Sequence, residues 1–444
     1  MLARSVTLNI LGQIGSLLIG FVASVALARW LGPSDRGLLA IMVSVANLGL
    51  ALGGLGIPFA VMYFSSKKDA DARALLGDSL LVAAVLAAVF VPLFWVLRGP
   101  IANLFGHGRG GAVWALAAIL IPVTFLDWSA HNQLLGNLRF GSYNLLMVSS
   151  KVAYLLGVVA LVRLLGLGLG GGLVAVAAGS VVVATGATAL ILREGRPRID
   201  WGLLRELRRY GTRVQIGTIF QVLNYRFDVV IVQFFRPLAA VGYYIVAQIL
   251  AELVILLARG FQSSVVPLVT RYEDDSRQSE TTIAAIRHHG ILAAAAIAAN
   301  AVLSPLVILF AFGPAFRSAM LPFFIMLPAM WFLGTSAVVA SDLSGRGRPG
   351  LASALAGGAA VLTVVLDLAL IPPLGVPGAA LASALTYTAF GIASLVALSR
   401  VTEIPIRTLV VPERSDFRAY SDALRRVLAR PAPRGTDETA DQIR

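Results

Sequence analysis

Twelve runs of about 20 mostly apolar residues follow one another along this chain, separated by charged or Gly/Pro-rich breaks. As a helix, a run of this length spans the hydrocarbon core of a bilayer. Composition agrees, because only 13% of the residues are charged, about half the share in soluble domains. We therefore predict an all-α integral membrane protein with 12 transmembrane helices. The predicted spans are 6–28, 38–64, 78–97, 112–135, 143–163, 171–192, 212–234, 240–267, 283–311, 319–341, 351–371 and 377–399.

Lysine and arginine are distributed unevenly between the two sides of this predicted membrane. With the N-terminus inside, 26 of the 36 cations fall in cytoplasmic segments and seven fall in outer ones. Positive residues in short loops stay on the cytoplasmic side. We therefore expect both termini in the cytoplasm. The net charge of +13 is explained by topology, and we expect no nucleic-acid partner.

Glycine-containing motifs recur at a nearly constant offset. Gly37 after the first span and Gly242 after the seventh are 205 residues apart, and two further pairs of motifs are offset by 207 and 209. This pattern predicts two parallel six-helix repeats, forming two lobes around a central cavity. The predicted domains are an N-terminal lobe (1–195), an interfacial linker helix (196–211), a C-terminal lobe (212–400) and a cytoplasmic basic tail (401–444).

Polar side chains at membrane depth are costly and usually face a cavity or a partner. Gln248, Glu252 and Arg259 share one face of the eighth span, and Asn47 occupies the repeat-equivalent position of Glu252. The stripe indicates either a water-filled cavity or a hydrogen-bonded seam between helices.

The seventh span and its repeat mate, the first, also carry polar faces. Gln215 and Arg226 lie on one face of the seventh span, and Asp228 lies on another. Asn9 and Gln13 share a face of the first span. We expect one face of each helix to line the cavity. A purely structural pairing of Arg226 with Glu252 or Asp367 is the alternative.

Two further sites in the N-terminal lobe carry ionisable residues. Asp127 and His131 lie one turn apart on the fourth span, where they form a candidate proton relay or a solvated pair. Lys151 and Arg163 bracket the fifth span, and we expect both to reach toward the membrane surfaces.

Several chemistries have no sequence support. The chain has no cysteine, and its four histidines are scattered. It has no phosphate-binding loop of the ATPase type and no long outer loop on which to build a catalytic surface. We therefore expect no metal, no cofactor and no enzymatic activity.

Four segments resemble motifs of a known family. The segment 28–38, ARWLGPSDRGL, resembles the first-loop signature of polysaccharide flippases. The segments NYRFD (224–228) and GYYIVA (242–247) resemble the start of their second half, and GRGRP (345–349) and GVPGAA (375–380) resemble their last spans. Together they resemble the polysaccharide transport (Wzx-type) branch of the multidrug/oligosaccharidyl-lipid/polysaccharide exporter superfamily.

The resemblance implies a V-shaped pair of lobes that export undecaprenyl-pyrophosphate-linked sugars across the bacterial inner membrane by alternating access. The implied partners are this lipid-linked oligosaccharide, membrane lipids and other polysaccharide-assembly proteins. The substrate-binding candidates are Arg226, Arg259, Glu252, Gln248, Gln215, Asn9, Gln13 and Asn47. The coupling-ion candidates are Asp228, Glu252, Asp127 and His131. The rival functions are a multidrug cation antiporter of the same fold and a membrane glycan polymerase or glycosyltransferase.

Overall fold

The computed structural model describes residues 2–67, 71–193, 195–261 and 275–417. Within these ranges the chain is helical, with no β-strand. The first half contains α1 (Leu2–Gly53), α2 (Ile57–Ser65), α3 (Ala72–Val96), α4 (Arg98–Gly106), α5 (Gly111–Ala117), α6 (Leu120–Gly136), α7 (Phe140–Gly157) and α8 (Gly168–Leu192). The second half contains α9 (Trp201–Phe235), α10 (Leu238–Ala251), α12 (Asp275–Leu306), α13 (Met320–Met326), α14 (Ala329–Gly345), α15 (Pro349–Leu374), α16 (Val376–Thr402) and α17 (Ile406–Val410).

The predicted all-α membrane class is confirmed. Nine helices in the described ranges are long and apolar enough to cross a membrane, and α13 with α14, bent by 54°, makes a tenth candidate. Within the described residues each of the twelve predicted segments is mostly helical, although some of them cross a break between two helices, and residues 262–267 of the eighth lie outside the described ranges. The count differs because α1 merges the first two segments and because α9, the seventh, is not among the ten.

Helix α1 contains a break between those two segments. Gly32 has φ 74° and ψ 174°, which is not a helical conformation, and Pro33 follows it. Glycine adopts a positive φ without the steric cost that a side chain would add. The ARWLGP sequence therefore ends one helix and starts the next with almost no connecting loop.

Two predicted boundaries differ from the structure. The second predicted span, 38–64, is interrupted where α1 ends at Gly53, and α2 begins at Ile57. The predicted separate linker helix over 196–211 does not form. Helix α9 begins at Trp201 and continues without a break through the predicted seventh span to Phe235. The Asp200 side chain caps its start by accepting hydrogen bonds from two backbone N–H groups of the first turn.

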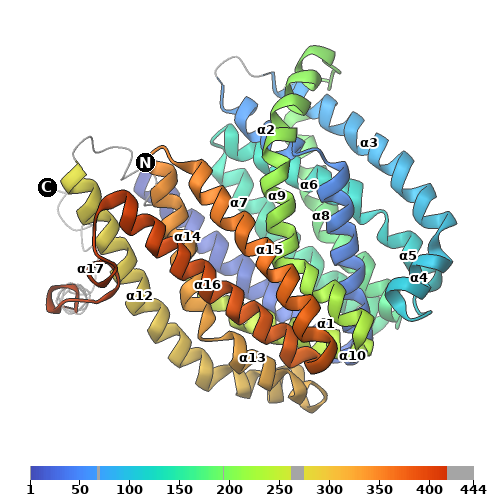
Figure 1. The fold of residues 1–444 in the computed structure, drawn as a ribbon. Helices are drawn as coiled ribbons and strands as arrows, with labels where there is room; N and C mark the ends of the chain where they lie inside the picture. Colours follow the sequence, from blue (N-terminus) through green and yellow to red (C-terminus); the bar gives the residue numbers. More distant parts are fainter. Residues whose placement is uncertain (1, 68–70, 194, 262–274, 418–444) are drawn as a thin grey trace, which may run out of the picture.

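The helices form two groups with α1, α9 and α10 between them (Figure 1). In the first half, α1 and α8 pack against α7, and α6 packs against α2, α3 and α8. In the second half, α16 packs against α13, α14 and α15, and α12 packs against α14. Across the boundary, α1 packs against both α10 and α9. One continuous set of buried apolar residues reaches across both groups, and Trp114 and Tyr244 are among its largest members.

Candidate functional site

A cavity of about 790 Å³ lies between the two halves. It is lined by α1, α2, α6, α7, α9 and the helical segment that continues α10 to Phe261. Its polar and charged lining includes Asn47, Lys151, Gln215, Glu252 and Arg259. Most of these positions lie in the parts of their helices that are nearer the predicted cytoplasmic end.

The eighth predicted span contributes one acid and one base to this cavity. Glu252 and Arg259 both line it, as a cavity-facing stripe requires. Gln248, one turn before Glu252, is only 2% exposed and lies in the packed interior instead. The stripe therefore divides into a buried part and a cavity-facing part. No described residue forms a hydrogen bond or ion pair with the Arg259 side chain.

Gln215 reaches the cavity from α9 and also ties the two halves together. Its side-chain amide donates a hydrogen bond to the backbone carbonyl of Ala51 near the end of α1. One turn earlier, Gly211 approaches Gly56 so closely that a Cβ on Gly56 would lie 2.2 Å from the Gly211 carbonyl oxygen. Small residues therefore allow α9 to meet the α1–α2 turn at backbone distance.

Lys151 is a cavity residue that the sequence analysis assigned to the membrane surface. It lines the cavity from α7, and its side chain runs beside Gly20 of α1. Within the described part of the chain its ammonium group has neither an ion pair nor a hydrogen bond. The sequence could have indicated this position through the depth of Lys151 in the membrane. It lies eight residues into a predicted span, which is roughly 12 Å along a helix.

Two of the remaining predicted cavity residues cannot be placed, and a third does not line the cavity. The side chains of Asn9 and Arg226 lie outside the described residues, although both positions fall within helices. Gln13 is exposed on α1 and is not part of the cavity wall.

Asp228 lies in a second polar site, buried inside the second half. The Tyr244 hydroxyl donates a hydrogen bond of 2.5 Å to the Asp228 carboxylate, and its oxygen lies 3.0 Å from Ser383 Oγ. Asp367 of α15 is fully buried and repels Asp228 electrostatically. Neither Asp367 oxygen has a hydrogen-bond partner among the described residues. The sequence analysis considered Asp367 only as a structural partner of Arg226 and did not place it beside Asp228.

Asp127 and His131 do meet, with 2.8 Å between the carboxylate and Nδ1. Both side chains are less than one-fifth exposed. Asp127 lines a smaller cavity that shares Lys151, Asn47 and Tyr154 with the central one.

Comparison with known proteins shows which family this chain belongs to. Residues 2–273 match the polysaccharide biosynthesis protein family, which is more than half of the chain. The chain belongs to this family. A curated relative is the succinoglycan biosynthesis transport protein ExoT of Rhizobium meliloti (strain 1021), which is 24% identical over 254 residues. That match covers 56% of this chain and 50%, about half, of ExoT.

Solved structures share the fold of this family member across most of its length. Lipid II flippase MurJ in an inward closed conformation has a TM-score of 0.75, with 15% identity over 96% of this chain and 100% of MurJ. An inward-facing multidrug resistance MATE family transporter has a TM-score of 0.73, with 14% identity over 87% of this chain and 94% of its own. An outward-facing MATE structure has a TM-score of 0.62, with 14% identity over 90% and 95%.

Proposed function

We propose that this chain moves a polyprenyl-pyrophosphate-linked oligosaccharide from the inner to the outer leaflet of the bacterial inner membrane by alternating access, without enzymatic chemistry. Both termini are cytoplasmic in this proposal. The observation that carries it is the cavity between the halves, where Lys151 and Arg259 face the same space and form no ion pair with any described residue. The family, the transport function in ExoT's name and the flippase function in MurJ's name support it.

The charge of the cavity suits a pyrophosphate. Charge-assisted hydrogen bonds to phosphate oxygens are shorter and stronger than neutral ones. Lys151 approaches from the first half and Arg259 from the second, so one anion would be held by both lobes. The amides of Asn47 and Gln215 add hydrogen-bonding groups for sugar hydroxyls. A multidrug cation antiporter shares the fold, but its cationic substrate would be repelled by the Lys151 and Arg259 side chains that line this cavity.

We further propose that Asp228 and Asp367 bind the coupling cation, a proton or a small monovalent ion. Two buried carboxylates that repel one another are stable only when a positive charge or a proton offsets them. Tyr244 and Ser383 provide neighbouring oxygen atoms. Asp127 and His131 remain a second candidate pair for proton transfer.

The central test is substitution of the two cavity cations. Lys151→Gln and Arg259→Gln should each lower transport of the lipid-linked sugar by about tenfold or more, because each removes one charge-assisted contact to phosphate. Lys151→Arg and Arg259→Lys should keep partial activity. Flipping is measured in proteoliposomes that contain matched amounts of each purified variant.

Arg163→Gln is the control, because Arg163 ends the same membrane segment as Lys151 but does not line the cavity. Unchanged flipping by both glutamine variants would contradict the proposal. Efflux of organic cations by the wild-type chain, without movement of lipid-linked sugar, would support the antiporter instead.

A further inference from the structure

The smaller cavity in the first half is a side chamber of the central one. It measures about 440 Å³ and is enclosed by α1, α6, α7 and α8, with α10 on one side. Lys151, Asn47 and Tyr154 line both cavities. A ligand group bound in the side chamber would therefore sit directly beside a ligand group held by Lys151.

Charged and neutral polar groups meet around this side chamber. Arg36 is 9% exposed, and its guanidinium donates a hydrogen bond of 3.3 Å to Ser24 Oγ. Asp127 faces the same space from α6, with His131 against its carboxylate. Hydroxyl groups from α1, α7 and α8 also line it: Ser24, Ser44, Ser150 and Ser180. Keeping such groups at membrane depth is costly, so their gathering around one hollow indicates a ligand rather than simple packing.

The positive, negative and neutral polar groups around the side chamber indicate the chemical class of its ligand. A bare phosphate would be repelled by Asp127, and an organic cation would be repelled by Arg36 and Lys151. A neutral, polyhydroxylated group suits both signs, because each sugar hydroxyl donates to a carboxylate and accepts from a guanidinium or an amide. The volume also falls within the range of small-molecule sites.

We propose that the side chamber binds the sugar joined directly to the pyrophosphate and so selects which glycan is transported. This inference rests on the proposed function, with the pyrophosphate held by Lys151 and Arg259. The sugar enters the first half, where Asp127 and Arg36 hydrogen-bond its hydroxyls. Sites that hydrogen-bond a substrate hydroxyl discriminate strongly against analogues that lack it, since the buried polar groups are then left unpaired.

The test separates sugar recognition from pyrophosphate recognition. The full-length chain in lipid nanodiscs is titrated with bare polyprenyl pyrophosphate and with the same lipid carrying one glucose, galactose or N-acetylglucosamine. We expect at least one sugar to tighten binding by about tenfold, the effect of roughly one hydrogen bond to a charged group. Asp127→Asn and Ser180→Leu should abolish this gain without weakening binding of the bare lipid. Lys151→Gln should weaken binding of every ligand.

The two substitutions act in different ways, so the test can still be made with one variant if the other fails to fold. Asp127→Asn removes a charge, whereas Ser180→Leu fills the chamber without removing a charge. Val181→Leu is the matched control, because Val181 follows Ser180 on α8 but is 42% exposed and lies outside both cavities.

Three results would overturn the inference. Equal binding of all sugar-bearing and bare lipids by the wild-type chain would leave the chamber without a sugar preference. A sugar preference that survives both chamber variants would place the sugar elsewhere. Loss of transport in Asp127→Asn with the preference intact would assign Asp127 to proton transfer with His131. Failure of the wild type to bind any of these lipids would instead overturn the proposed function itself.

Discussion

At the scale of single residues, the polar side chains of this family member fall into two environments with different chemistry. Lys151, Glu252 and Arg259 face an open cavity, where a ligand can reach them. Asp228 and Asp367 are fully buried, so only a group as small as a proton or a monovalent ion can neutralise them in place. Substrate and coupling ion would therefore occupy different sites.

Asp367→Asn should separate ion coupling from substrate binding. It removes one of two repelling carboxylates, so the variant should still bind and passively flip lipid-linked sugar but should lose the acceleration produced by an imposed proton or sodium gradient. Flipping in proteoliposomes with and without each gradient measures this. Asp35→Asn, at an exposed ion pair with Arg109, is the control. Full acceleration in Asp367→Asn would refute the assignment.

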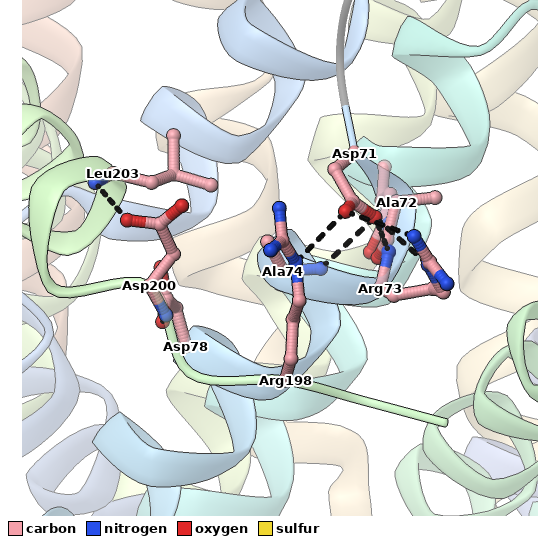
Figure 2. Close-up of polar contacts among 9 residues, drawn as sticks. Asp71, Ala72, Arg73, Ala74, Asp78, Arg198, Asp200 and Leu203 are labelled. Atoms are coloured by element: carbon pink, nitrogen blue, oxygen red, sulfur yellow. Dashed lines mark hydrogen bonds and ion pairs between the residues drawn. The ribbon is translucent and has the colours of Figure 1, made fainter. Parts of the chain in front are cut away.

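At the scale of elements, the connection between the two halves is fastened to the start of α3 (Figure 2). The Arg198 side chain pairs with Asp71 at 2.9 Å, and the backbone N–H of Asp200 donates to Asp78 at 2.9 Å. Partial burial alone would raise the pKa of Asp71, but hydrogen bonds from Arg73 and Ala74 outweigh it and lower that pKa below its ordinary value. The ion pair between Arg198 and Asp71 is therefore present at neutral pH and is lost only in acid.

Gly77 allows this segment to lie flat on α3. A Cβ at Gly77 would lie 2.1 Å from the Arg198 carbonyl oxygen, which is too close for any side chain. Gly77→Val should displace the connection and destabilise the protein by about 1–3 kcal/mol. Thermal unfolding of detergent-purified variants measures the effect. Gly99→Val, with no atom within 4 Å of the new Cβ, should be nearly neutral, and equal losses in both variants would contradict the packing argument.

At the scale of the whole molecule, the halves close against each other at the predicted outer end. A Cβ on Gly37 would lie 2.0 Å from the Leu238 carbonyl oxygen, and a Cβ on Gly242 would lie 2.1 Å from the Pro33 carbonyl oxygen. The repeat-related glycines thus make equivalent contacts across the boundary. On the same boundary, the Gln233 side chain donates to the Leu104 carbonyl at 3.1 Å.

Gly37→Val should prevent this closure and shift the protein toward a state open at the predicted outer end. Spin labels on cysteines introduced at Gly99 and Arg317, one exposed site in each half, should then report a longer distance than in the parent chain. The chain has no cysteine of its own, so the labels are specific. Gly15→Val on the same helix adds a side chain into open space. An unchanged distance in Gly37→Val would refute the closure.

The sequence by itself determined where the membrane helices lie and which residues share a face of each helix. Apolar runs of bilayer length must become helices, because every backbone polar group in lipid has to be satisfied within its own segment. Helical periodicity then placed Glu252 and Arg259 together on one face, and Asp127 beside His131. The glycine pair at 37 and 242 likewise followed from the repeat offset alone.

Only the tertiary structure decided what stands opposite each face. Periodicity groups Gln248 with Glu252, but the neighbouring helices bury the first and leave the second in the cavity. Periodicity assigns no role to Lys151. Only the folded structure shows that its side chain runs beside Gly20 of α1. Periodicity gives no signal for Asp367, whose importance comes from Asp228 on another helix. A helix's own sequence sets the direction of its side chains, whereas its neighbours set whether that direction meets protein, water or a ligand.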